Sequence, residues 1–163
     1  MITTKVKIKQ HLAEYCYGKF SGCDISRPVT FPDKLNIYHV IWDLLEVCPR
    51  TGPVCDGNLE IVLPERTIGK NPLTYNYLGE RAIPHINKHL DIIFSTELFY
   101  FMLDQKNHFN IPYNRSIFAF MRRYGITSVQ EDTLWKSFYR WKKRIVLREK
   151  RPEMEKNFED LAR

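Results

Sequence analysis

Two cysteine pairs are the first residues whose spacing could support chemistry. Cys16 and Cys23 are separated by six residues, and Cys48 and Cys55 repeat that spacing. Structural zinc sites usually use tighter pairs, about two to four residues apart. Cys16 also falls on an apolar helical face, where a buried thiol behaves as a small hydrophobe. We therefore interpret the cysteines as reduced thiols and expect no metal and no cofactor, with a four-cysteine zinc site as the alternative.

Two histidines offer the next metal-binding pattern. His85 and His89 are four residues apart on a predicted helix, and Glu97 is a possible third ligand. The zinc-protease motif needs a Glu directly after the first His, and Ile86 stands there instead. The chain also shows no Gly-rich phosphate loop, no nucleophile elbow and no paired carboxylates. We predict no catalytic residues and no enzyme, and a metal-dependent enzyme is the alternative.

Positive charge is concentrated in one C-terminal segment. Residues 115–151 hold eleven Lys or Arg against Glu131, Asp132 and Glu149, a local net charge of +8. The rest of the chain holds 14 cations and 16 carboxylates, so this segment supplies the whole basic excess of the +6 protein. Such asymmetry favours a polyanionic partner, most simply nucleic acid.

The basic segment reads as two helices joined by a short turn. The first, over 114–124, is predicted from an apolar stripe of Ile117, Phe120, Met121 and Tyr124. Gly125 can end it in the left-handed conformation, with Ile126 touching Met121. Ser128 and Glu131 have the spacing of a capping box, which predicts the start of the second helix. Helix, Gly-containing turn and helix resemble a helix-turn-helix module.

The second helix divides its faces between core and cations. Its apolar stripe is Leu134, Phe138, Trp141 and Ile145. Cations can neutralise phosphates, and long polar side chains can reach base edges. The candidate DNA-binding residues are Arg122, Arg123, Gln130, Thr133, Lys136, Ser137, Arg140, Lys143, Arg144 and Arg148. Trp135 and Tyr139 could stack on unpaired bases, although aromatic residues on such a helix more often belong to the core.

Two alternatives stand beside DNA binding. The cations could form a merely solvated face, or dock on an acidic partner protein. Glu131 and Asp132 also lie where the tip of a recognition helix would enter the groove, and they would repel phosphate. We favour double-stranded DNA as the partner and keep protein–protein interaction as the second hypothesis.

Elsewhere the sequence predicts a mainly α fold with a minor short-stranded β element near 28–31 and 58–63. A first helix should end near Gly18. A second should span 35–47, with Asp33 as its cap, and a third 74–107, with a break at Pro84. Its segment 90–104 is apolar nearly all round, which indicates a core helix or a homodimer interface.

We expect three parts along the chain. Residues 1–110 form a mixed helical body, 111–151 a basic helical hairpin packed on it, and 152–163 a flexible acidic tail. Lysines interrupt the N-terminal stretch where a secretory signal needs an apolar run. The longest apolar run, Leu98–Leu103, is too short to span a bilayer. These features place the protein in the cytoplasm, without a membrane partner.

Three segments carry a resemblance to a known group. KIKQHLAEYC, NLEIVLPERTIGKNPLTYNYLGERA and FMRRYGITSVQEDTLWKSFYRWKKR together resemble uncharacterised proteins of Mu-like transposable prophages, over residues 5–145. The resemblance implies a phage or mobile-element role inside a bacterial host cell. It transfers no functional residue, so the candidate sites rest on the residues themselves.

Overall fold

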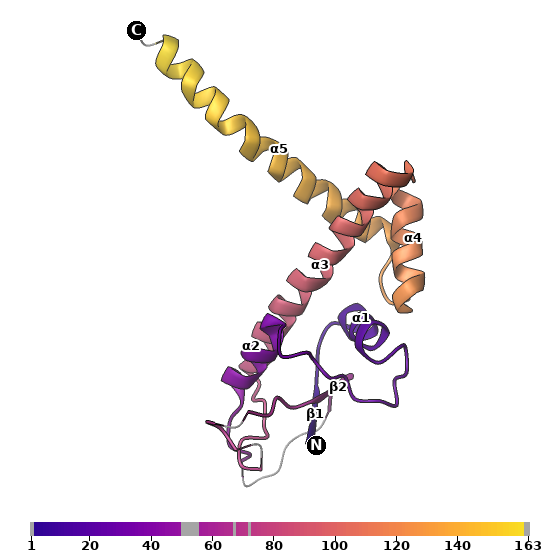
Figure 1. The fold of residues 1–163 in the computed structure, drawn as a ribbon, viewed down its shortest axis with the longest axis vertical. Helices are drawn as coiled ribbons and strands as arrows, with labels where there is room; N and C mark the ends of the chain where they lie inside the picture. The colour runs from indigo at the N-terminus through magenta and orange to yellow at the C-terminus, as the bar shows by residue number, and fades with distance from the viewer. Residues whose placement is uncertain (1, 50–55, 67, 72, 162–163) are drawn as a thin grey trace.

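The computed structural model (Figure 1) describes the chain apart from residues 1, 50–55, 67, 72 and 162–163, and it describes side chains through Val146 and at Arg148. The described residues form five helices and a two-stranded antiparallel sheet, which confirms a mainly α fold with a minor β element. The elements are β1 (Thr3–Val6), α1 (Gln10–Phe20), α2 (Asn36–Leu44), β2 (Leu59–Val62), α3 (Ala82–Phe109), α4 (Tyr113–Tyr124) and α5 (Glu131–Leu161).

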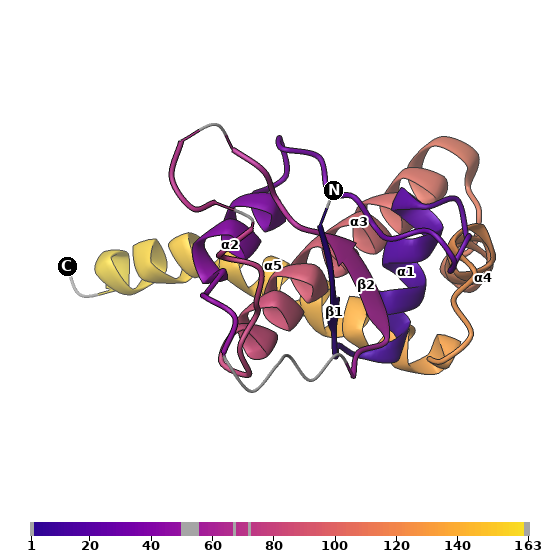
Figure 2. The same cartoon turned by 90° about the horizontal axis from the view of Figure 1, so that it is seen from below.

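The long helix α3 organises the molecule, since α1, α2 and α4 all pack against it. Seen from below in Figure 2, α2 lies toward one end of α3 and α4 toward the other, with the sheet and α1 on one side. The last helix, α5, contacts α4 and then projects away from the other elements (Figure 1). It runs through Leu161 and so takes in most of the segment 152–163 that the sequence suggests is a tail.

The core is aromatic and centres on α3. The ring of Phe94 lies 5.2 Å from that of Tyr15 on α1 and 5.9 Å from that of Phe120 on α4. Segment 90–104 therefore supplies the core with five buried side chains, whereas Ile92 and Tyr100 on the same segment stay exposed. Its buried side chains are Leu90, Phe94, Leu98, Phe99 and Met102.

The sheet differs from the sequence prediction. At 28–31 only Val29 pairs, through an isolated bridge to Ile61, and Thr3–Val6 is the strand that pairs with β2. Pro28 begins this segment and Pro32 follows it, and because neither has a backbone N–H donor the segment cannot sustain a ladder.

The predicted helix 35–47 is too long. It ends at Leu44 because Glu46 turns away and forms a bridge with Tyr77. The Lys70 ammonium donates to three carbonyls at this end, those of Trp42 at 3.0 Å, Asp43 at 2.7 Å and Leu45 at 2.7 Å. The predicted cap at Asp33 is also wrong, because the N-cap position is Leu35 and no side chain caps the helix.

Two further helix boundaries differ from the predicted positions. The third helix begins at Ala82 instead of 74, so Pro84 lies in its first turn, where a missing N–H breaks no hydrogen bond. The first helix ends at Phe20, two residues beyond Gly18. A Cβ at position 18 would lie 2.3 Å from the Tyr124 carbonyl oxygen. Gly18 thus permits the close approach of α4 to α1.

Candidate nucleic-acid interface

The turn that ends α4 is as the sequence predicts. Gly125 adopts the left-handed conformation, with φ of +65° and ψ of +33°. The Ile126 amide donates to the Met121 carbonyl at 2.9 Å, the bond that closes a helix at such a glycine. This short connection places α5 directly after α4.

The start of α5 is fixed by a residue that the sequence interpretation missed. Instead of a capping box between Ser128 and Glu131, the Glu14 carboxylate of α1 accepts both backbone amides, from Thr127 at 2.8 Å and Ser128 at 3.1 Å. The Ser128 hydroxyl donates to it as well, at 3.0 Å. A carboxylate accepts such charge-assisted bonds strongly. Glu14 therefore clamps the turn onto α1.

These hydrogen bonds lower the pKa of Glu14. Its partial burial alone would raise the pKa of the carboxyl group. The bonds from the Thr127 and Ser128 amides and the Ser128 hydroxyl outweigh that effect and hold the pKa below its ordinary value. The clamp is thus strongest in the ionised form.

A second carboxylate ties α4 to the body. Glu97 on α3 accepts from the Tyr124 hydroxyl at 2.5 Å and also from the Tyr15 hydroxyl and the Lys19 ammonium on α1. Partial burial would raise the pKa of Glu97, but these three donors outweigh it and lower the pKa. Burial and the bond to Glu97 raise the pKa of Tyr124 to about 12. Glu97 is therefore a structural acceptor for Tyr15, Lys19 and Tyr124, and within the described residues it forms no potential metal-binding cluster with His85 and His89.

One face of α5 packs on the body, as predicted. Phe138 and Leu134 are buried, and Trp141 and Ile145 are partly buried. The ring of Phe99 on α3 lies 5.5 Å from that of Phe138 and 5.0 Å from that of Trp141. Side chains on the opposite side of the helix must therefore face solvent.

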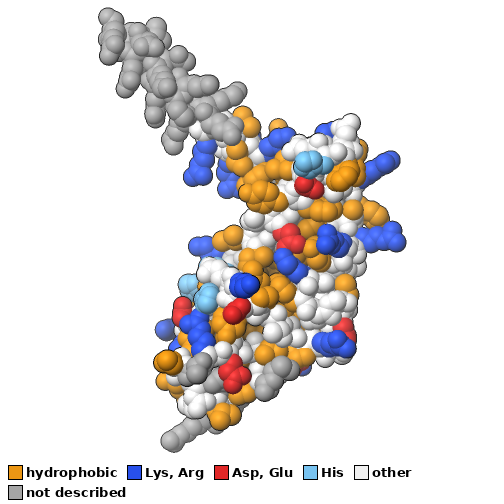
Figure 3. Space-filling model, in the orientation of Figure 1, with side chains coloured by type: hydrophobic (Ala, Val, Ile, Leu, Met, Phe, Trp, Pro, Cys, Tyr) orange, Lys and Arg blue, Asp and Glu red, His pale blue; other side chains and the backbone are white. Residues whose placement is uncertain are grey.

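The predicted DNA-binding side chains lie on that free surface, with Ser137 partly buried. The exposed ones are Arg122, Arg123, Gln130, Thr133, Lys136, Arg140, Lys143, Arg144 and Arg148. Among the described residues, Lys136 is the one cation of α4 and α5 paired with a carboxylate, that of Asp132 at 3.7 Å. On the face shown in Figure 3, cationic side chains lie where α5 leaves the other helices and, separately, over α4. Arg122 and Arg123 belong to α4, whereas the other exposed candidates belong to α5 or, for Gln130, directly precede it.

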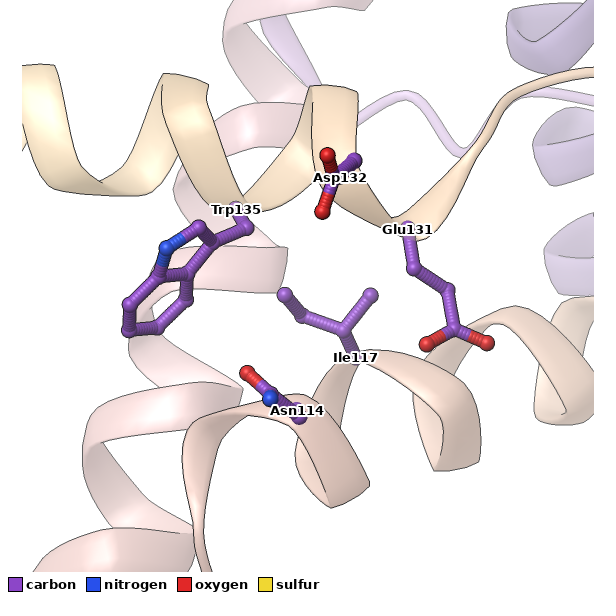
Figure 4. A pocket seen from close by; sticks show the side chains of 5 residues that line it. All are labelled: Asn114, Ile117, Glu131, Asp132 and Trp135. Atoms are coloured by element: carbon purple, nitrogen blue, oxygen red, sulfur yellow. The ribbon is translucent and has the colours of Figure 1, made fainter.

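The tip of α5 is acidic. Figure 4 shows a pocket of about 230 Å³ between the first turns of α4 and α5, lined by Asn114, Ile117, Glu131, Asp132 and Trp135. Two carboxylates at this end would repel phosphate. Gln130 and Thr133, next to them in sequence, are thus poorly placed to lead a recognition helix into a groove. The free cations begin a turn or more further along the helix, on its side.

The two aromatic candidates for base stacking, Trp135 and Tyr139, differ in their exposure to solvent. Trp135 is partly buried and lies against Tyr113, with ring centroids 5.8 Å apart, so it serves the hairpin packing. Tyr139 is 60% exposed, contrary to the expectation that it belongs to the core. Phe118 and Arg115 on α4 are exposed too, and the sequence interpretation missed both. The sequence feature that indicates their exposure is their position off the apolar stripe of α4.

The cysteines form no shared site that the structure describes. Cys16 is fully buried, and burial raises the pKa of its thiol to about 12. Cys23 is exposed and Cys48 partly buried, whereas Cys55 lies outside the described residues. Within the described part of the chain, no three His, Cys, Asp or Glu side chains come together in a way that could hold a metal ion.

Comparisons with known proteins identify no relative of this chain. No protein-family model matches the chain, and no curated protein or solved structure gives a significant match. The likeness to Mu-like prophage proteins therefore stays a prediction from sequence. Of the helices described, none combines the length and apolar character needed to cross a membrane.

Proposed function

We propose that this chain binds DNA through the outer side of α5 and acts as a phage-type accessory or regulatory protein in the cytoplasm of a bacterial host. The observation that carries the proposal is the set Arg140, Lys143 and Arg144. All three are exposed, and none pairs with a carboxylate among the described residues. Free cations held on one rigid helix release counterions from a phosphate backbone when they bind it.

The geometry favours contact along the side of α5 over insertion of its tip. Thr133, Ser137, Arg140 and Arg144 recur at helical spacing, so polar and cationic groups share one stripe. Phosphate contacts from Arg140 and Arg144 would set the register on the duplex. The mobile-element role rests on the sequence resemblance alone.

A salt titration tests the proposal. We expect Arg140→Ala, Lys143→Ala and Arg144→Ala together to weaken binding of the full chain to duplex DNA, measured by fluorescence anisotropy. The slope of log K against log salt should shrink by about 2–3, because each lost phosphate contact contributes about 0.9.

The matched control removes the same charge elsewhere. Lys5, Lys7 and Lys34 are exposed and lie before α2, so their triple Ala variant should leave the slope nearly unchanged. Equal slopes for the two triple variants would contradict a specific role for α5. If duplex DNA instead fails to displace an acidic protein bound to the same cations, protein interaction becomes the better proposal.

A further inference from the structure

An exposed aromatic ring on α4 stands between two arginines. Phe118 is 56% exposed, and Arg115 and Arg122, three residues before it and four after it, are exposed as well. Residues at these spacings are neighbours on one helix face. Neither arginine pairs with a carboxylate among the described residues. More than half of Phe118 stays in water, so burial in the core stabilises it little.

The same arrangement occurs on α5. Tyr139 is 60% exposed, with Lys136 three residues before it and Lys143 four after it, both exposed. The ion pair of Lys136 with Asp132, at 3.7 Å between exposed side chains, is weak and easily exchanged. Two helices thus present a solvent-facing ring with a cation on each side.

We infer that these two triads bind unpaired bases, so that the partner is a single-stranded nucleic acid or a duplex with an opened segment. A base can stack on each ring while the flanking cations hold its neighbouring phosphates. Within a duplex the base faces are already stacked on each other and cannot reach the rings. The inference rests on the proposed function and refines its substrate.

A third exposed ring provides a control within the same molecule. Tyr100 on α3 is 68% exposed, but the residues at the same spacings are Glu97 and Asp104. Carboxylates there would repel the phosphates of a strand whose base stacked on Tyr100. A ring without flanking cations should therefore contribute nothing.

The experiment compares oligothymidine with a duplex of equal length, each titrated against the full chain. Phe118→Leu with Tyr139→Leu keeps apolar bulk but removes both π faces. We expect the Kd for oligothymidine to rise by about tenfold or more. The Kd for the duplex should stay the same, and Tyr100→Leu should change neither value. Unchanged thermal midpoints would confirm that all variants fold.

The outcomes separate the two proposals. If the double variant binds oligothymidine as well as the unmodified chain does, or loses both ligands equally, the stacking inference is overturned, while duplex binding through α5 stands. If the unmodified chain binds neither ligand, the proposed function fails and the inference fails with it. A loss confined to oligothymidine supports both.

Discussion

At the scale of single residues, Glu14 is the side chain on which the position of the hairpin most depends. It comes from the first helix and accepts two backbone amides more than 110 positions later, at Thr127 and Ser128. Both amides belong to the turn before α5, where no helical partner exists for them. One carboxylate thus replaces a local cap and also joins the N-terminal helix to the basic helix.

Replacing this carboxylate should loosen the turn. Glu14→Gln keeps the shape but loses the charged acceptor, so we expect the free energy of unfolding to fall by about 1–2 kcal/mol. Urea denaturation followed by circular dichroism measures it. Asp33→Asn is the matched control, because no side chain caps α2 and the change should cost almost nothing. A larger loss for Asp33→Asn than for Glu14→Gln would show that the capping assignments are reversed.

At the scale of elements, the α4–α5 connection depends on the conformation of Gly125. Its φ of +65° is costly for a β-branched residue, so Gly125→Val should lower the free energy of unfolding by about 1–2 kcal/mol. Gly125→Asn should lose less, because Asn tolerates the left-handed region. Thermal unfolding of both variants checks the order, and equal midpoints for Val and Gly at this position would rule out the turn geometry.

The sequence predicted the elements whose signals are local. Gly125 and Ile126 end the helix directly before them, and the apolar stripe of α5 follows from the spacing of its own residues. The end of α4 and the buried face of α5 could therefore be predicted from short stretches of sequence. The misjudged features depend on distant partners. Ser128 bonds to Glu14 instead of forming a capping box with Glu131. Glu46 pairs with Tyr77 instead of continuing α2, and β2 pairs with β1 instead of with a strand at 28–31. No short window of sequence contains those contacts.

The candidate site shows the same limit. The cations of α5 were predicted because charge can be counted along the chain. Phe118 lies off the apolar stripe of α4, so its exposure could have been inferred from that position. The exposure of Tyr139 could not, since an aromatic residue favours the core unless neighbouring helices leave it uncovered. The packing of α5 on the other helices decides that this ring remains outside.

At the scale of the whole molecule, two carboxylates join α1 to the hairpin. Glu14 holds the turn before α5, and Glu97 gathers Tyr15, Lys19 and Tyr124 from α1 and α4. The position of the proposed nucleic-acid surface therefore depends on two ionised groups.

This arrangement predicts how stability changes with pH. The pKa values of Glu14 and Glu97 are lowered from the ordinary 4.5, so their contribution is full above that pH and is lost as pH falls through the lower folded values. The pKa of Tyr124 is raised from 10 to about 12, so its contribution is full below pH 10 and is lost as pH rises toward 12. Urea unfolding across the pH range should show both declines. In the double variant Glu14→Gln with Glu97→Gln, the loss of stability at low pH should be shallower, because neither group then titrates. A loss as steep as in the unmodified chain would show that other carboxylates cause it.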